Sequence, residues 1–114
     1  MPGNDLTLIR LLAYMSVRHR AHAKAQALYE ALLALDEDDR DAAKGLAWAH
    51  LEGGNPREAL KVLDAIAGEP GSVVQLLRAR ALARLGQPED AGAAMRAFLA
   101  SRPRPGPGRQ ETLR

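Results

Sequence analysis

The sequence predicts an all-α protein made of three stacked antiparallel helical hairpins. The 114-residue chain is 46% hydrophobic but contains only one Trp, two Tyr and one Phe. Its Ala, Leu, Arg, Glu and Gln residues favour helix, whereas the β-branched and aromatic residues that favour strands are few. An apolar pattern recurs after 34 and then 32 residues, and the short connections between the predicted helices make neighbouring helices antiparallel.

The recurring pattern is a small residue followed by two bulky residues on the same helical face. An alanine is followed by a bulky residue four positions later and by another three positions beyond that, which are the i, i+4 and i+7 positions of a helix. The alanine lets two helices approach closely, and the bulky residues fill the groove beside it. The three copies are Ala25, Tyr29 and Leu32; Ala59, Leu63 and Ile66; and Ala91, Met95 and Phe98.

Glycine and proline mark the helix boundaries in the second and third copies. Gly54 and Gly86 are expected to end the preceding helices. Pro56 and Pro88 are expected in the first turn of the next helices, where a missing N–H costs nothing. The first helix of each copy is expected to carry a large residue followed by a small one, and these pairs are Leu12-Ala13, Leu46-Ala47 and Arg78-Ala79. The third pair departs from the pattern because it has Arg in place of Leu. In these residues and in its period, the sequence resembles tetratricopeptide repeats.

The expected organisation follows from this repeat. We expect helices at about 6–19, 22–35, 40–52, 56–67, 72–85 and 88–101, which form hairpins at about 6–38, 39–71 and 72–102. Residues 1–5 are expected to be flexible, and the Pro/Gly/Arg-rich segment 103–114 to be a disordered tail without a capping helix. The acidic turn 36–41 lacks the ligand spacing of an EF-hand loop, so its carboxylates are expected to cap the next helix.

Stacked hairpins of this kind turn the first helix of each pair toward a concave inner face. The inward positions of the repeat predict a groove with an apolar floor, the single Trp, one Tyr and a rim of Arg and Lys. Aromatic and Arg side chains in a partly apolar hollow are typical of protein-binding surfaces. The predicted partner-binding residues are Arg10, Tyr14, Val17, Arg18, Lys44, Trp48, Leu51, Val73, Leu76 and Arg80.

Two interpretations of Trp48 stay open, because its side chain can contact a partner in the groove or fill the core between hairpins. Tyr14 and Trp48 occupy positions where repeat proteins that grip acidic chaperone tails need asparagine. A carboxylate clamp is therefore not expected. An amphipathic or extended apolar segment is the better ligand for such a groove.

The residue content predicts neither an enzyme nor a cofactor or metal site. The chain has no Cys, which excludes a disulfide, a thiolate zinc site and a thiol nucleophile. His19 and His22 lie three residues apart, but no third metal ligand accompanies them. No glycine-rich phosphate loop follows a strand, since no strand is predicted.

Charge and hydropathy set the expected location and partners. The net charge of +2 is concentrated toward the tail, so no basic face predicts nucleic-acid binding. No apolar run approaches the roughly 18 residues of a membrane-spanning helix, so membrane insertion is not expected. No secretory signal is visible at the amino terminus. A cytoplasmic location is expected.

The size and repeat plan also resemble a family of small export chaperones of bacterial type III secretion systems, the YscY (SctY) type. The resemblance covers most of residues 6–103, above all the leucine-rich first helix, the stretch 22–35 with its charged turn, and the third hairpin. It implies a chaperone that binds a small exported component of the YscX (SctX) type. The pair would then engage the export gate at the inner membrane.

Two alternatives remain beside this prediction. A needle-subunit chaperone of the YscG type has a similar size and repeat plan, and a general tetratricopeptide scaffold unrelated to secretion fits the same fold. A constitutive partner or self-association is also expected, because the last helix has no cap and its Met95, Phe98 and Leu99 cannot all be covered by the third hairpin.

Overall fold

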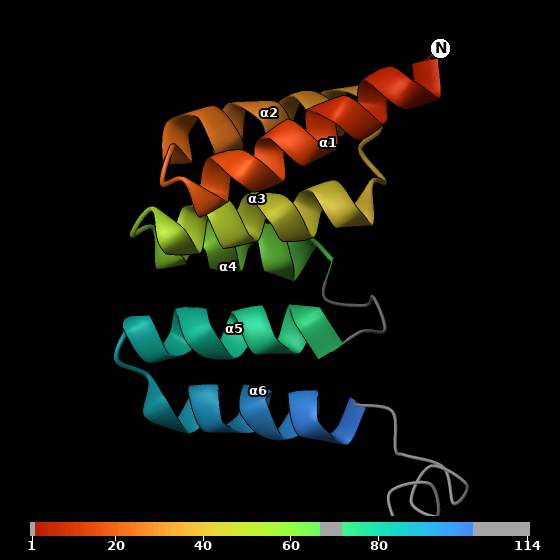
Figure 1. Ribbon diagram of the computed structural model, residues 1–114. Coiled ribbons are helices and arrows are strands. Elements are labelled where there is room, and N and C mark those ends of the chain that lie inside the picture. Colours follow the sequence, from red (N-terminus) through yellow and green to blue (C-terminus); the bar gives the residue numbers. More distant parts are fainter. Residues whose placement is uncertain (1, 67–71, 102–114) are drawn as a thin grey trace, which may run out of the picture.

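The computed structural model describes residues 2–66 and 72–101, with side chains described for 6–66 and 73–100. These residues form six helices and no strand, which confirms the predicted all-α class. The helices are α1 (Pro2–Arg18), α2 (His22–Leu35), α3 (Arg40–Glu52), α4 (Pro56–Ala65), α5 (Ser72–Arg84) and α6 (Pro88–Ser101). They pair as three hairpins stacked in chain order, with α1 and α2 at one end and α6 at the other (Figure 1).

Two helix boundaries differ by more than one residue from those expected. The first helix begins at Pro2, so the described residues 2–5, where a flexible segment was predicted, are part of the helix. Proline suits this position because its fixed φ is already helical and its missing N–H costs no bond. The fourth helix ends at Ala65 instead of residue 67. The predicted tail 103–114, and with it the expected lack of a capping helix, lies outside the described residues.

The core consists of two main clusters, one at each junction between hairpins. The first joins hairpins one and two and contains Ala25, Tyr29 and Leu32 of α2. The second joins hairpins two and three and contains Leu63 and Ile66 of α4. The repeat pattern read from the sequence therefore occupies the interior at both junctions. Trp48, Leu33 and Val62 pack against both clusters and link them.

The predicted helix punctuation is confirmed. Gly54 and Gly86 adopt positive φ angles of 83° and 76°, two residues after the last residues of α3 and α5. This left-handed backbone is one that residues with a Cβ adopt only at a cost. Pro56 and Pro88 are the first residues of α4 and α6. In the acidic turn, Asp39 caps α3 as expected, since its Oδ1 accepts a hydrogen bond of 3.0 Å from the backbone N–H of Ala42.

No helix in the described part of the chain is both long and apolar enough to cross a membrane.

Candidate protein-binding groove

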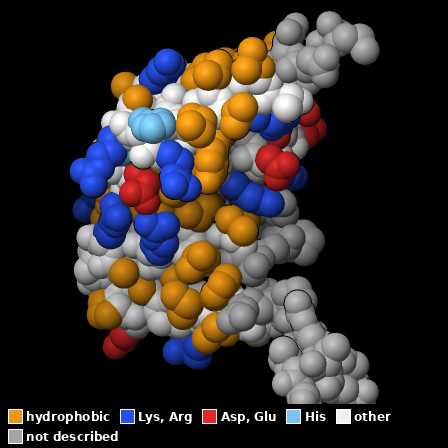
Figure 2. Space-filling model, viewed as in Figure 1, with side chains coloured by type: hydrophobic (Ala, Val, Ile, Leu, Met, Phe, Trp, Pro, Cys, Tyr) orange, Lys and Arg blue, Asp and Glu red, His pale blue; other side chains and the backbone are white. Residues whose placement is uncertain are grey.

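The first helices of the three hairpins, α1, α3 and α5, lie along one face of the stack. Figure 2 shows hydrophobic side chains running along this face, with Lys and Arg side chains beside them. Two open hollows lie on it, and they share the side chain of Trp48. We refer to the two hollows together as the inner groove.

The first hollow has a volume of about 320 Å³ and lies between α1, α3 and α5. Its lining contains five of the predicted partner-binding residues, together with Gly45 and Leu77, which were not predicted. Val73 at its edge is 48% exposed, whereas Leu77 at its base is 5% exposed. The lining residues are Tyr14, Lys44, Gly45, Trp48, Val73, Leu77 and Arg80.

The second hollow has a volume of about 370 Å³ and lies beside the α1–α2 turn. It contains two further predicted residues, Val17 and Arg18. Its remaining lining is more polar than that of the first hollow. The lining residues are Val17, Arg18, Arg20, His22, Trp48 and Glu52.

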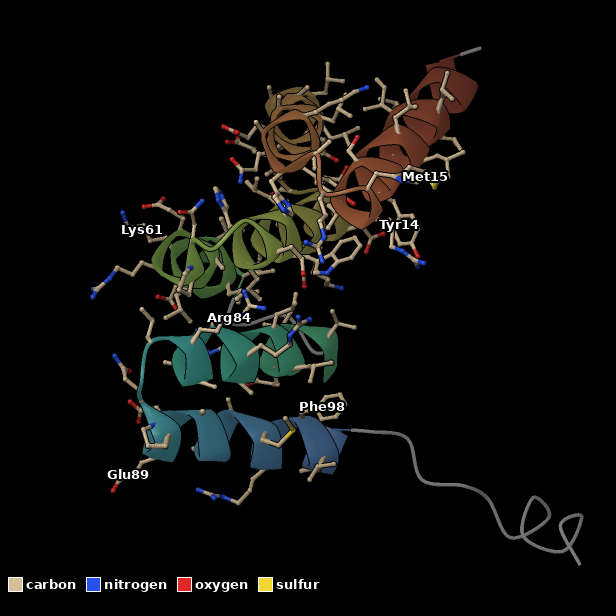
Figure 3. The ribbon with its side chains drawn as sticks, turned by 60° about the vertical axis from the view of Figure 1, so that its left-hand side comes forward. Tyr14, Met15, Lys61, Arg84, Glu89 and Phe98 are labelled. Atoms are coloured by element: carbon tan, nitrogen blue, oxygen red, sulfur yellow. The ribbon has the colours of Figure 1, made fainter. Side chains whose placement is uncertain are left out.

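An aromatic pair forms the centre of the groove. The ring centroids of Tyr14 and Trp48 lie 5.5 Å apart, with a tilt of 37° between the ring planes. Arg18 Nη1 donates a hydrogen bond of 3.0 Å to the Tyr14 hydroxyl, and its guanidinium lies 5.8 Å from the ring centroid. In Figure 3, Tyr14 projects from α1 toward α3. The pair holds two large apolar surfaces in place at the groove, which suits contact with a partner.

The side chain of Trp48 lies at both of the places that its sequence position left open, the core between hairpins and the groove. Its side chain is half-buried and packs against both core clusters. It also lines both hollows. One part of the indole therefore stabilises the stack, while another part is presented to the groove.

The positive side chains at the rim make internal contacts. Arg80 donates to Glu52 at 2.8 Å, and Lys44 lies 3.8 Å from Asp41. Arg84, one turn after Arg80 on α5, donates to the backbone carbonyl of Leu51 at the C-terminal end of α3 (Figure 3). Carboxylates thus offset the positive charge of Arg80 and Lys44, and the first hollow offers mainly apolar contacts, whereas the second is more polar.

Arg10 lies outside both hollows and joins two hairpins instead. Its Nη1 donates to Asp39 Oδ1 at 3.1 Å, and Nη2 donates to Oδ2 of the same carboxylate. The hydrogen bond from Arg10 is the main reason that the pKa of Asp39 lies below its ordinary value. The expectation that Arg10 lines the binding groove is therefore corrected, because its fork is occupied by the carboxylate that caps α3.

Leu51 and Leu76 also depart from the prediction. Leu51 is 0% exposed and belongs to the core cluster between hairpins two and three, so the prediction of a direct partner contact is wrong for it. Leu76 is half-buried and lines neither hollow. Leu77 takes the position at the groove base instead. The repeat contained a signal for it, because residue 77 follows Gly45, which also lines the hollow, by 32 positions.

The described residues contain no cluster of three or more His, Cys, Asp or Glu side chains placed to hold a metal ion.

Comparison with known proteins supports the repeat assignment. Residues 17–72 match the family model of the tetratricopeptide repeat, from the end of α1 through α4. A comparison with curated proteins finds no match. The match spans just under half of the chain, and the same hairpin arrangement continues through α6. The chain therefore has a tetratricopeptide-repeat-like fold, and repeats of this kind suggest a protein-binding scaffold.

Proposed function

We propose that the chain is a cytoplasmic chaperone of a type III secretion system. In this role it holds an apolar segment of a small exported component of the YscX (SctX) type in the inner groove until export. The observation that carries the binding part of this proposal is the exposed apolar surface around Tyr14, Trp48 and Val73. Tyr14 is 43% and Val73 48% exposed, although both lie beside the core.

The form of the groove favours an apolar ligand segment over an acidic peptide. Three helices, α1, α3 and α5, line the groove on one face of the stack. An amphipathic helix can bind such a groove with its apolar face. Of the groove's cationic side chains, Lys44 and Arg80 pair with Asp41 and Glu52, and Arg18 donates a hydrogen bond to the Tyr14 hydroxyl. An acidic ligand would have to displace these contacts, whereas an apolar segment gains from covering Val73 and the aromatic pair.

The secretion role rests on the resemblance of residues 6–103 to the YscY type. The tetratricopeptide match over residues 17–72 supports the repeat plan of that family. Since covering an apolar segment before export requires only binding, no catalytic group is needed. The resemblance further suggests that the loaded pair docks on the inner-membrane export gate.

Co-expression with candidate exported components tests the proposal. We expect a YscX-type component to co-purify with the wild-type chain at a defined stoichiometry. Trp48→Ala and Val73→Asp should reduce the recovered partner at least about tenfold, which corresponds to roughly 1.4 kcal/mol of binding free energy. Circular dichroism should show unchanged helix content for Val73→Asp, since its side chain is half exposed.

A matched control is Leu35→Asp, which places the same charge at a 70% exposed leucine that lines neither hollow. This variant should retain the partner. Recovery of a needle subunit instead of the YscX-type component would assign the chain to the needle-chaperone alternative. Full retention of the partner by both groove variants would refute the groove as its binding site.

A further inference from the structure

The first helix is apolar on two opposite faces. Ala13 and Val17 face the core and are 0% and 4% exposed. The opposite face carries Leu8, Leu11, Leu12 and Met15, which are between 41% and 54% exposed. A helix with apolar residues on two opposite faces is typical of a helix that is covered on both sides. In Figure 3, Met15 projects from α1 on the side away from α2.

The repeat identifies what covers this face elsewhere in the chain. Residues 8, 12 and 15 of α1 correspond, 34 positions later, to Ala42, Leu46 and Ala49 of α3. Those three residues are buried at 0%, 7% and 0% exposure, in the cluster that contains Tyr29 of α2. In this chain, the second helix of one hairpin therefore covers this face of the first helix of the next.

The same arrangement recurs at the second junction. Val74 and Ala81 of α5 follow Ala42 and Ala49 by 32 residues and are both 0% exposed. Leu77, which follows Gly45 by 32 residues, is 5% exposed, whereas the residue that follows Leu46 by 32 positions is the half-buried Arg78. Val74, Leu77 and Ala81 share a cluster with Leu63 and Ile66 of α4. We call this face of α1 the leading face. It is the same surface that two junctions within the chain cover with a preceding hairpin.

The last helix carries the surface with which a second helix covers the first helix of the next hairpin. Tyr29 and Leu63 are 7% and 0% exposed because α3 and α5 cover them, but the corresponding Met95 of α6 is 36% exposed. Leu99, one turn further along α6, is 53% exposed. We call this surface of α6 the trailing face. The leading and trailing faces lie at opposite ends of the stack (Figure 1).

Side-chain sizes at the two faces match those of the internal junctions. At the first junction, Tyr29 meets Gly45, where an added Cβ would lie 2.2 Å from the Tyr29 ring. At the second, the corresponding residues are Leu63 and Leu77, both in one cluster. The corresponding residues at the chain's ends are Met95 and Leu11. Two medium-sized side chains meet there, as at the second junction, so close packing is sterically feasible.

From this correspondence we infer that a second copy of the chain docks head to tail. The trailing face of one copy packs on the leading face of the next, which repeats the hairpin junction already present twice in each chain. Such a contact is heterologous, so it produces a growing series or a closed ring instead of a two-fold dimer. It uses α1 and α6, and it leaves the inner groove open for the proposed ligand.

Sedimentation equilibrium of the wild-type chain tests the inference. The mean mass should rise above the monomer mass of 12.3 kDa as the concentration increases from about 5 to 500 µM. Leu11→Glu and Met95→Glu should each weaken association at least about tenfold, because each places a charge in the apolar contact. Val73→Glu is the matched control, since it changes the groove and should leave self-association unchanged.

Mixing the two single variants distinguishes this contact from others. Leu11→Glu retains an intact trailing face, and Met95→Glu retains an intact leading face. An equimolar mixture should therefore form a dimer that cannot grow, which also shows that both variants fold. If a variant precipitates alone, Leu11→Ser and Met95→Ser provide the milder pair.

Three outcomes would overturn the inference. One is a wild-type chain that stays monomeric at the highest concentration. The second is a Met95→Glu variant that associates like the wild type, which would indicate a symmetric contact through the leading face alone. The third is a mixture that forms no dimer although both variants are helical. Because co-expression with Trp48→Ala and Val73→Asp tests the groove separately, failure here leaves the proposed chaperone function intact.

Discussion

The Arg10 guanidinium makes two hydrogen bonds to the carboxylate of Asp39, the residue that caps α3. Asp39 Oδ1 receives both Arg10 Nη1 at 3.1 Å and the N–H of Ala42 at 3.0 Å. One carboxylate thus joins the first hairpin to the start of the next helix. The Asp39 side chain is 9% exposed, so its hydrogen bonds are better protected from solvent than those of an ion pair on the surface.

Replacing this carboxylate by an amide separates the cap from the ion pair. Asp39→Asn retains a side-chain oxygen that can cap α3, since Asn and Asp are comparable N-caps, but it loses the charge that binds Arg10. We expect unfolding free energy to fall by about 1 kcal/mol, because Arg10 itself remains partly exposed. Urea denaturation measures the change. Asp38→Asn, at an exposed neighbour, should change stability far less.

The same pair predicts a pH dependence. The hydrogen bond from Arg10 lowers the pKa of Asp39 from its ordinary value of 3.8. A lowered pKa in the folded state means that the stabilisation is present above the unfolded pKa and is lost as pH falls through the folded pKa. The stability difference between wild type and Asp39→Asn should thus be constant near neutrality and shrink below about pH 4. A difference that stays unchanged down to about pH 2 would contradict this explanation.

Gly45 gives a prediction about packing between the first two hairpins. A Cβ at this position would lie 2.2 Å from Tyr29 Cε1, so Gly45→Ala must displace the ring. Overpacking costs about 1–3 kcal/mol, which outweighs the roughly 1 kcal/mol that alanine gains in a helix. Combining it with Tyr29→Leu should relieve the clash. Thermal unfolding of the two single variants and the double variant measures this, and the double variant should lose less stability than the sum of the two single losses. Additive losses of stability would contradict a direct contact between the two residues.

The repeat register made most of the fold predictable from the sequence. Ala25 and Ala59 are fully buried at the positions where the pattern requires close helix approach. Gly54 and Gly86 lie at the helix ends as expected, because the backbone there has a positive φ that glycine adopts without strain. The groove was partly predictable for the same reason, since register places Tyr14, Trp48 and Val73 on one face.

The residues that could not be predicted depend on contacts between hairpins. Arg10 and Arg80 have long side chains that can reach several neighbours. Each binds a carboxylate of the next or preceding hairpin, and this depends on the distances between hairpins, which the sequence does not give. Leu51 shares the inward register with Trp48 but lies at the end of α3, where hairpin three covers it completely. Register defines a face of the helix, whereas burial depends on what packs against that face.

The single Trp provides a spectroscopic test of the aromatic pair. Trp48 is half-buried, and Tyr14 lies with its ring centroid 5.5 Å from that of the indole. Tyr14→Ala should admit water to the indole and shift its fluorescence emission to longer wavelength, with little loss of helix content because Tyr14 is 43% exposed. Leu35→Ala, also at an exposed position, should leave the emission unchanged. An unshifted spectrum for Tyr14→Ala would mean that Tyr14 does not shield Trp48.

Two glycines of the third hairpin should respond oppositely to the same substitution. Gly86 has a φ of 76°, which a residue with a Cβ adopts at a cost, so Gly86→Ala should lower the unfolding free energy by about 1 kcal/mol. Gly92 lies inside α6, and the nearest atom to an added Cβ is Arg96 Nη1 at 3.5 Å, an ordinary contact. Gly92→Ala should therefore raise stability by up to about 1 kcal/mol through helix propensity. Chemical denaturation of both variants measures the two signs, and a stabilising Gly86→Ala would show that the turn tolerates a different backbone conformation.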